Sequence, residues 1–140
     1  MQLEKYTLFS GHTATGSIYN SVIYDTENAQ NVRIWFEGPY KAGAGGSAII
    51  AIDHAMYMGG AMQPFTGVRL IGAGGSSASL TEVRAGVFTL ASGVLHSFIA
   101  FYIDPNFMPN CLQARYELSG VAGSASAGTI TAFMSVTRDI

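Results

Sequence analysis

The chain has 140 residues, of which 11% carry a formal charge and 49% are hydrophobic, and its formal net charge is −2. This length predicts a single domain, residues 1–140, that can bury a core without disulfides. The seven Lys and Arg residues are scattered singly, which argues against a nucleic-acid surface because such a surface needs clustered cations. Cys111 is the only cysteine, so we expect a small buried hydrophobe and no intrachain disulfide.

The first half of the chain has the pattern of short β-strands separated by turn-forming residues. In Val32–Phe36 the side chains of Val32, Ile34 and Phe36 share one face of a strand, and Gly38-Pro39 is predicted to end it. The other apolar or β-branched segments predicted to be strands are Leu3–Phe9, Ile18–Tyr24, Ala48–Ile52 and Val68–Ile71.

Val87–Ile103 is a long apolar segment without a formal charge. Its second part, Val94–Ile103, has large apolar residues at both parities, which predicts a central strand covered on both faces. Ala91-Ser92-Gly93 predicts a hairpin connection from the strand Val87–Leu90. A membrane-spanning helix is not expected, because such a helix needs about 20 consecutive apolar residues and this segment is interrupted at Ser92-Gly93.

The remaining segments also favour strands over helices. Ser79–Glu82 matches a helix capping box, but Gly86 follows so closely that we expect a loop or a short strand. Leu112–Leu118 and Thr129–Thr137 alternate cleanly between apolar and polar residues, as half-buried strands do. Eight to nine short strands without a convincing helix predict an all-β fold, an antiparallel β-sandwich of jelly-roll type. The N-terminal residues show no cationic segment followed by an apolar one, so we expect no secretory signal.

Three segments rich in small residues, at positions 42–48, 72–79 and 120–128, could be turns or phosphate-binding loops. None is followed by Lys-Ser or Lys-Thr at the start of a helix, as a phosphate-binding loop requires. We therefore interpret them as small-residue turns and expect no cofactor.

The segment Asp53–Phe65 is too apolar for an ordinary loop. His54 with Met56, Met58 and Met62 could bind Cu(I), since thioethers and imidazole are soft ligands. The alternative, which the low charge content favours, is an adaptable apolar patch for a neighbouring chain, with no metal. Asp104–Asn110 has the same character, because two prolines flank Phe107 and Met108. The predicted interface residues are Met56, Tyr57, Met58, Met62, Phe65, Phe107 and Met108.

Catalytic motifs are absent from the sequence. His12, His54 and His96 are isolated, and no serine lies in a G-x-S-x-G turn. Asp25-Thr26-Glu27 lacks the glycine of an aspartic-protease loop. We therefore expect no catalytic residues and no enzyme activity.

The shortage of charge suggests that other protein chains cover much of the surface, so we expect the chain to work within an assembly. The alternative is that Ser, Thr, Asn and Gly supply enough polar surface. The opening LFSGHTATGSIYNSVIYDTENAQNV, the glycine-rich connections and the close ARYELSG…GTITAFMSV resemble cement, or decoration, proteins of tailed-bacteriophage heads.

This resemblance covers nearly the whole chain but includes no short diagnostic motif. It implies a jelly-roll subunit that pairs as a homodimer and binds the major capsid protein outside an icosahedral head, where capsomers meet. It also implies a location on the virion after synthesis in the bacterial cytoplasm, without direct contact to nucleic acid or membrane, and no catalytic residues. A carbohydrate-binding β-sandwich of a phage or bacterial surface is the alternative, with Trp35, Tyr40 or Tyr57 as stacking platforms.

Overall fold

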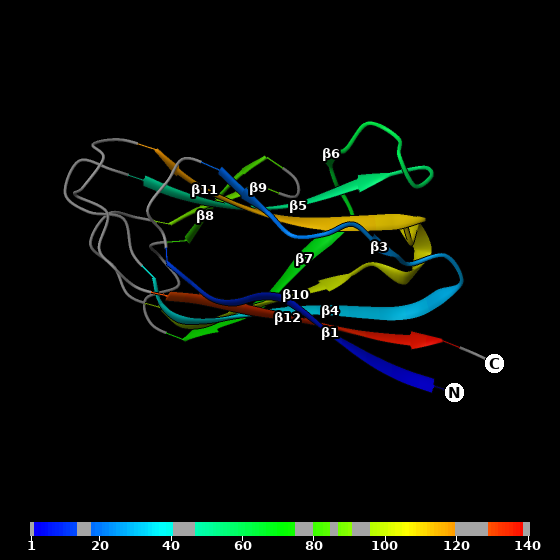
Figure 1. Cartoon of the computed structure of the whole chain (residues 1–140), viewed down its shortest axis with the longest axis horizontal. Coiled ribbons are helices and arrows are strands. Elements are labelled where there is room, and N and C mark those ends of the chain that lie inside the picture. The colour runs from blue at the N-terminus through cyan, green and yellow to red at the C-terminus, as the bar shows by residue number, and fades with distance from the viewer. Residues whose placement is uncertain are drawn as a thin grey trace.

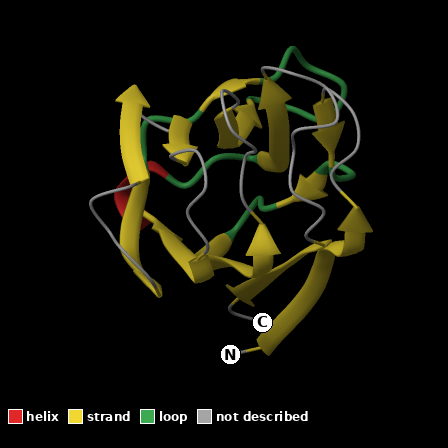
Figure 2. Ribbon diagram, turned by 90° about the vertical axis from the view of Figure 1, so that its left-hand side faces the viewer, coloured by secondary structure: helices red, strands yellow, loops and turns green. Residues whose placement is uncertain are grey.

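The computed structural model describes residues 2–13, 18–40, 47–74, 80–84, 87–90, 96–119 and 129–138. These residues form twelve β-strands and one 3-10 turn, arranged as two antiparallel sheets that stack face to face (Figure 1). No helix in the described part of the chain is long and apolar enough to cross a membrane. Seen after a turn of 90°, the strands form two layers that face each other (Figure 2). The predicted all-β sandwich is confirmed.

The first sheet, called sheet A, has the strand order β1-β12-β4-β10-β7. Its central strand β4 pairs with β12 on one side and with β10 on the other. The bounds are β1 (Gln2–Thr13), β12 (Thr129–Arg138), β4 (Ala29–Tyr40), β10 (His96–Ile103) and β7 (Val68–Gly74).

The second sheet, called sheet B, has the order β2-β11-β5-β9-β8, with β3 beside β11 and β6 beside β5. Its longest pairing joins β11 to β5, from Cys111↔Ala55 to Ser119↔Ser47. The bounds are β2 (Ile18–Asn20), β3 (Tyr24–Asp25), β11 (Cys111–Ser119), β5 (Ser47–Ala55), β6 (Gln63–Pro64), β9 (Val87–Leu90) and β8 (Leu80–Arg84).

The chain repeatedly crosses between the sheets, and the resulting strand orders are those of a jelly roll. This connectivity corrects the predicted hairpin between Val87–Leu90 and the following strand. β9 pairs with β5 and β8 in sheet B, whereas β10 pairs with β4 and β7 in sheet A. The hairpin residues Ala91-Ser92-Gly93 lie outside the described residues. A turn-forming tripeptide cannot reveal which sheet the next strand joins, because strand pairing depends on distant segments.

The core confirms the predicted alternation of β4, β11 and β12. Val32, Ile34 and Phe36 are buried, and the Phe36 ring meets the Phe101 ring edge-on at a centroid distance of 6.0 Å. The core faces of the two other strands are likewise buried: Leu112, Ala114 and Tyr116 on β11, and Ala132, Met134 and Val136 on β12. All of these side chains belong to one hydrophobic cluster that both sheets share.

The second face of β10 is only partly covered, which corrects the prediction of a strand buried on both faces. Ile99, Phe101 and Ile103 are buried in the core. Phe98 and Tyr102 point to the opposite face, where Tyr102 is 40% exposed. In a two-layer sandwich each sheet has one face against the core, so apolar residues at the other parity remain at the surface.

Several strand bounds also differ from the sequence prediction, among them those of β1, β5 and β7, and two further differences have a clear physical cause. β4 continues past Gly38-Pro39 to Tyr40, because the pairing with β10 shifts by one residue between Phe98↔Glu37 and His96↔Tyr40. Such a bulge accommodates a proline in a strand. The predicted strand Ile18–Tyr24 is divided into β2 and β3. Between them the Ser21 hydroxyl accepts a hydrogen bond of 3.0 Å from the Ala114 amide, so a side chain replaces part of the backbone pairing.

Leu80–Glu82 of the capping-box segment lie in strand β8 and not in a helical turn, in agreement with the sequence interpretation, and Ser79 lies outside the described residues. Of the three small-residue segments, only Ser47-Ala48 and Gly72–Gly74 lie within the described residues, in β5 and β7. The side chains of His12, Tyr40 and His96 lie outside the described part of the structure.

Candidate docking surfaces

The two apolar segments singled out in the sequence meet at one end of the sandwich, on the right in Figure 1. β5 ends at Ala55 and β11 begins at Cys111, and these two residues are paired. The segments that follow β5 and precede β11 are therefore neighbours. Asn110 Nδ2 donates a hydrogen bond of 2.6 Å to the Met56 carbonyl, and the Cys111 thiol donates one of 3.4 Å to the Ala55 carbonyl.

Further hydrogen bonds fix the segment 104–110 to the body of the sandwich. The Asp104 amide donates to the Gly67 carbonyl at 2.8 Å, and the Asp104 carboxylate caps the 3-10 turn Pro105–Phe107 by accepting from the Asn106 amide. The fully buried Thr26 donates from its hydroxyl to the Pro109 carbonyl at 2.7 Å. The segment is thus a rigid support for its side chains.

Four of the predicted interface residues form an exposed surface at this end, which we call the apolar tip. They are Met56, Tyr57, Met58 and Phe107, with exposed fractions of 72%, 68%, 54% and 63%. The other three lie deeper. Met62 is half-buried, Phe65 belongs to the core and Met108 packs against it. Their role in an interface stays a prediction, but burial distinguishes the exposed residues from those that lie beneath them.

The arrangement around His54 bears on the Cu(I) alternative. The His54 ring packs at a centroid distance of 4.8 Å from the ring of Phe65, and Met56 and Met58 extend into solvent. Among the residues that the structure describes, no three His, Cys, Asp or Glu side chains are grouped as metal ligands would be. Cys111 is buried, as predicted.

A second apolar surface lies on the solvent face of sheet A, which we call the aromatic face. It consists of Trp35, Phe98, Tyr102, Phe133 and Ile71, from strands β4, β10, β12 and β7. Trp35 and Phe98 are stacked, with a centroid distance of 4.6 Å and an interplanar angle of 9°. Trp35 Nε1 donates a hydrogen bond of 2.9 Å to Glu37 Oε1. The alternation in the sequence indicated the outward direction of Trp35, but recognising the aromatic face required the strand order.

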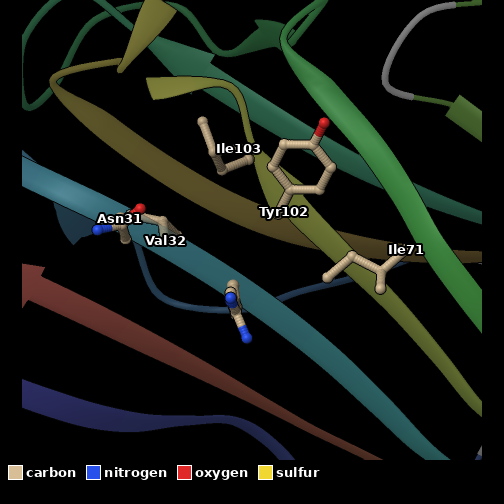
Figure 3. Close-up of a pocket in the computed structure, with 6 residues that line it drawn as sticks. Asn31, Val32, Ile71, Tyr102 and Ile103 are labelled. Carbon is tan, nitrogen blue, oxygen red and sulfur yellow. The ribbon is translucent and has the colours of Figure 1, made fainter. Parts of the chain in front are cut away.

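An open hollow adjoins this face and has a volume of about 510 Å³ (Figure 3). It is lined by Asn31, Val32, Arg33, Ile71, Tyr102 and Ile103. Figure 3 shows Tyr102 and Ile71 on neighbouring strands, with Asn31 and Val32 on β4. Among the described residues, the Arg33 guanidinium forms no ion pair. The aromatic face therefore presents both apolar rings and a cation to whatever covers it.

No protein-family model and no curated protein sequence matches the chain. Solved structures with a similar arrangement of strands include the SPBc2 prophage-derived protein YomS, which is 12% identical with a TM-score of 0.49 over 98% of this chain and 96% of that one. Another is the tripod (BppUct-A-L) from the baseplate of bacteriophage Tuc2009, 10% identical with a TM-score of 0.40 over 98% of this chain and 64% of that one.

A third is the cyanophage Pam1 capsid asymmetric unit, 12% identical with a TM-score of 0.39 over 98% of this chain and 82% of that one. Identities and TM-scores this low transfer no function to the chain. The fold assignment rests on the strand pairings themselves.

Proposed function

We propose that the chain is a structural virion protein that binds the outside of an icosahedral phage head as a dimer and cements neighbouring capsomers. The partner would be the major capsid protein of the same phage. The jelly-roll sandwich, the low charge content and the sequence resemblance to cement proteins of tailed phages support this function, with the cement protein of Bordetella bacteriophage as the specific resemblance.

The apolar tip is the observation that carries the proposal. A group of large apolar side chains at a protein surface marks an interaction site, and anchors of this kind dominate the binding energy of interfaces. Met56 and Phe107 stand on backbone segments that Asn110 and Thr26 hold in place. Many copies bound across joints of a shell would add their interface energies and resist the outward pressure of packaged DNA.

The test is to replace Met58 or Phe107 by glutamate and to measure the occupancy of the chain on purified phage heads by gel densitometry and cryo-electron microscopy. We expect occupancy to fall at least tenfold, because a charge would be buried in the contact. Val22 is 66% exposed and lies outside the tip, so Val22→Glu is the matched control. Unchanged occupancy of both tip variants, with their circular dichroism also unchanged, would rule out the tip as the anchor.

A carbohydrate-binding module is the second candidate function, and the exposed Trp35 beside the open hollow favours it. The flat apolar face of an aromatic ring offers a surface against which a sugar ring can stack. One face of the Trp35 ring is already covered by Phe98, however, which leaves less ring surface for a sugar. A glycan array, followed by titration of tryptophan fluorescence with any sugar bound, distinguishes this function from the first. Trp35 is the single tryptophan, so the signal reports on this face alone.

A further inference from the structure

We propose that two copies of the chain pair face to face through the aromatic face, around a two-fold axis that crosses the strands at the level of Trp35. This inference rests on the dimer of the proposed function and names its interface. The apolar tip is left free for the capsid.

The register of sheet A arranges the outward residues in three parallel rows. The middle row is Phe133, Trp35 and Ala100. A second row lies on the same face, two residues away from the middle row on every strand. It consists of Ser135, Arg33 and Tyr102. A third row, two residues away on the opposite side of the middle row, consists of Thr131, Glu37 and Phe98.

A two-fold axis that lies in the interface and follows the middle row makes this face complementary to itself. It brings Trp35 and Phe133 of one copy against the same residues of the other. It also exchanges the two outer rows, so that Arg33 of each copy faces Glu37 of the other, and Tyr102 faces Phe98. An isologous interface requires this reciprocity, in which residue i meets residue j and residue j meets residue i.

Charge also favours this axis over a two-fold axis that runs along the strands. An axis along the strands would place Arg33 against Arg33 and Glu37 against Glu37, and such like-charge contacts disfavour an interface. Among the described residues, the Arg33 guanidinium forms no ion pair. The Glu37 carboxylate accepts one side-chain hydrogen bond there, from Trp35 Nε1. Both groups are therefore available to a partner.

The size of the face is adequate for a dimer. It comprises five strands of 7 to 12 residues. At a strand spacing of about 4.8 Å and a rise of about 3.3 Å per residue, this makes a surface of roughly 700 Å². Stable interfaces of standard size bury about 800 Å² on each partner. Within the described residues, the other two cations of this face, Lys5 and Arg69, lie on the edge strands β1 and β7.

Charge reversal tests the pairing directly in the full-length chain. Arg33→Glu and Glu37→Arg each bring like charges together twice in the dimer, so we expect each to raise the dimer dissociation constant at least tenfold in sedimentation equilibrium at low salt. The double variant Arg33→Glu/Glu37→Arg restores opposite charges and should return the constant to within about threefold of the parent. Phe107→Glu, in the apolar tip, is the control and should leave dimerisation unchanged.

Tryptophan fluorescence provides a second readout, since Trp35 lies on the axis and is the only tryptophan. On dilution through the dissociation constant, acrylamide quenching should increase as Trp35 becomes exposed. A parent chain that is monomeric at all concentrations would overturn the proposal. So would single reversals without effect, no rescue in the double variant, or a fluorescence change that follows added sugar and not protein concentration.

The dimer interface and the cementing function can be disproved separately. A chain that occupies phage heads but dimerises independently of Arg33 and Glu37 overturns this interface alone. A chain that dimerises as described but does not bind heads overturns the cementing function alone.

Discussion

Asn110 Nδ2 lies 2.6 Å from the Met56 carbonyl oxygen, 54 positions earlier in the chain. This hydrogen bond joins the two segments of the apolar tip. Asn110→Ala removes the donor at an exposed position, so we expect the free energy of unfolding to fall by only about 1 kcal/mol. Occupancy on phage heads should fall by more than this small loss of stability can explain, because the segment that carries Met58 loses its attachment to Asn110. Asn106→Ala, in the same segment, is the control for denaturation and occupancy measurements, and an equal effect of both variants would contradict the expectation.

Thr26 connects the turn before β4 to the segment before β11. Its hydroxyl donates to the Pro109 carbonyl in a fully buried position. Thr26→Val keeps the shape but leaves that carbonyl without its donor, which should lower the free energy of unfolding by about 2 kcal/mol. Urea denaturation measures the change, and Thr66→Val at an exposed threonine should change it by less than about 0.5 kcal/mol.

Asp53 and Arg115 form an ion pair of 2.9 Å on sheet B, with side-chain exposures of 7% and 22%. Arg115→Gln would leave the Asp53 carboxylate buried without its counter-ion. We expect a loss of about 2 to 3 kcal/mol in the free energy of unfolding, less than for a fully buried pair because water still reaches the guanidinium. The double variant Asp53→Asn/Arg115→Gln removes the stranded charge and should be more stable than the single variant; a less stable double variant would contradict this reasoning.

The contacts of the Tyr6 hydroxyl determine how the free energy of unfolding depends on alkaline pH. Its hydroxyl donates to the Glu4 carboxylate, and this hydrogen bond, with burial and the charge of Glu4, raises the pKa of Tyr6 above its ordinary value of 10.0, against a smaller opposing effect of Arg138. The folded chain therefore holds this proton more tightly than the unfolded chain does. The resulting stability is complete below the ordinary pKa and is lost as pH rises through the raised pKa.

Tyr6→Phe should therefore reduce the decline of unfolding free energy between about pH 9 and about pH 11. Thermal denaturation of the parent and variant across this range measures the difference. A steeper decline in the variant than in the parent would contradict the assigned cause.

The faces of the strands were predictable because a strand alternates its side chains with a period of two, whatever its partner. The pattern of Val32, Ile34 and Phe36 therefore identified core residues correctly without any knowledge of the fold. The same rule puts Arg33 and Trp35 on the opposite face of the strand. It could not show that Phe98 would stack on Trp35, because that contact depends on β10 lying beside β4.

For the candidate surfaces, too, the sequence predicted some features and only the structure revealed others. Low charge and the apolar character of the two segments led to the residues of the tip. Phe65 and Met108 were included with them, although the structure places Phe65 in the core and Met108 against it, because composition does not distinguish an exposed apolar side chain from a buried one.

By itself, the sequence determined that this is an all-β chain, which residues of its clearest strands face the core, and that its surface is poor in charge. Those properties follow from local periodicity and composition. Only the tertiary structure decided that β9 and β10 belong to different sheets, that Asp53 meets Arg115, and that the aromatic rings of β12, β4 and β10 form one face. The physical reason is that an apolar strand can pair equally well with many others, so that the choice is made by the packing of the whole sandwich.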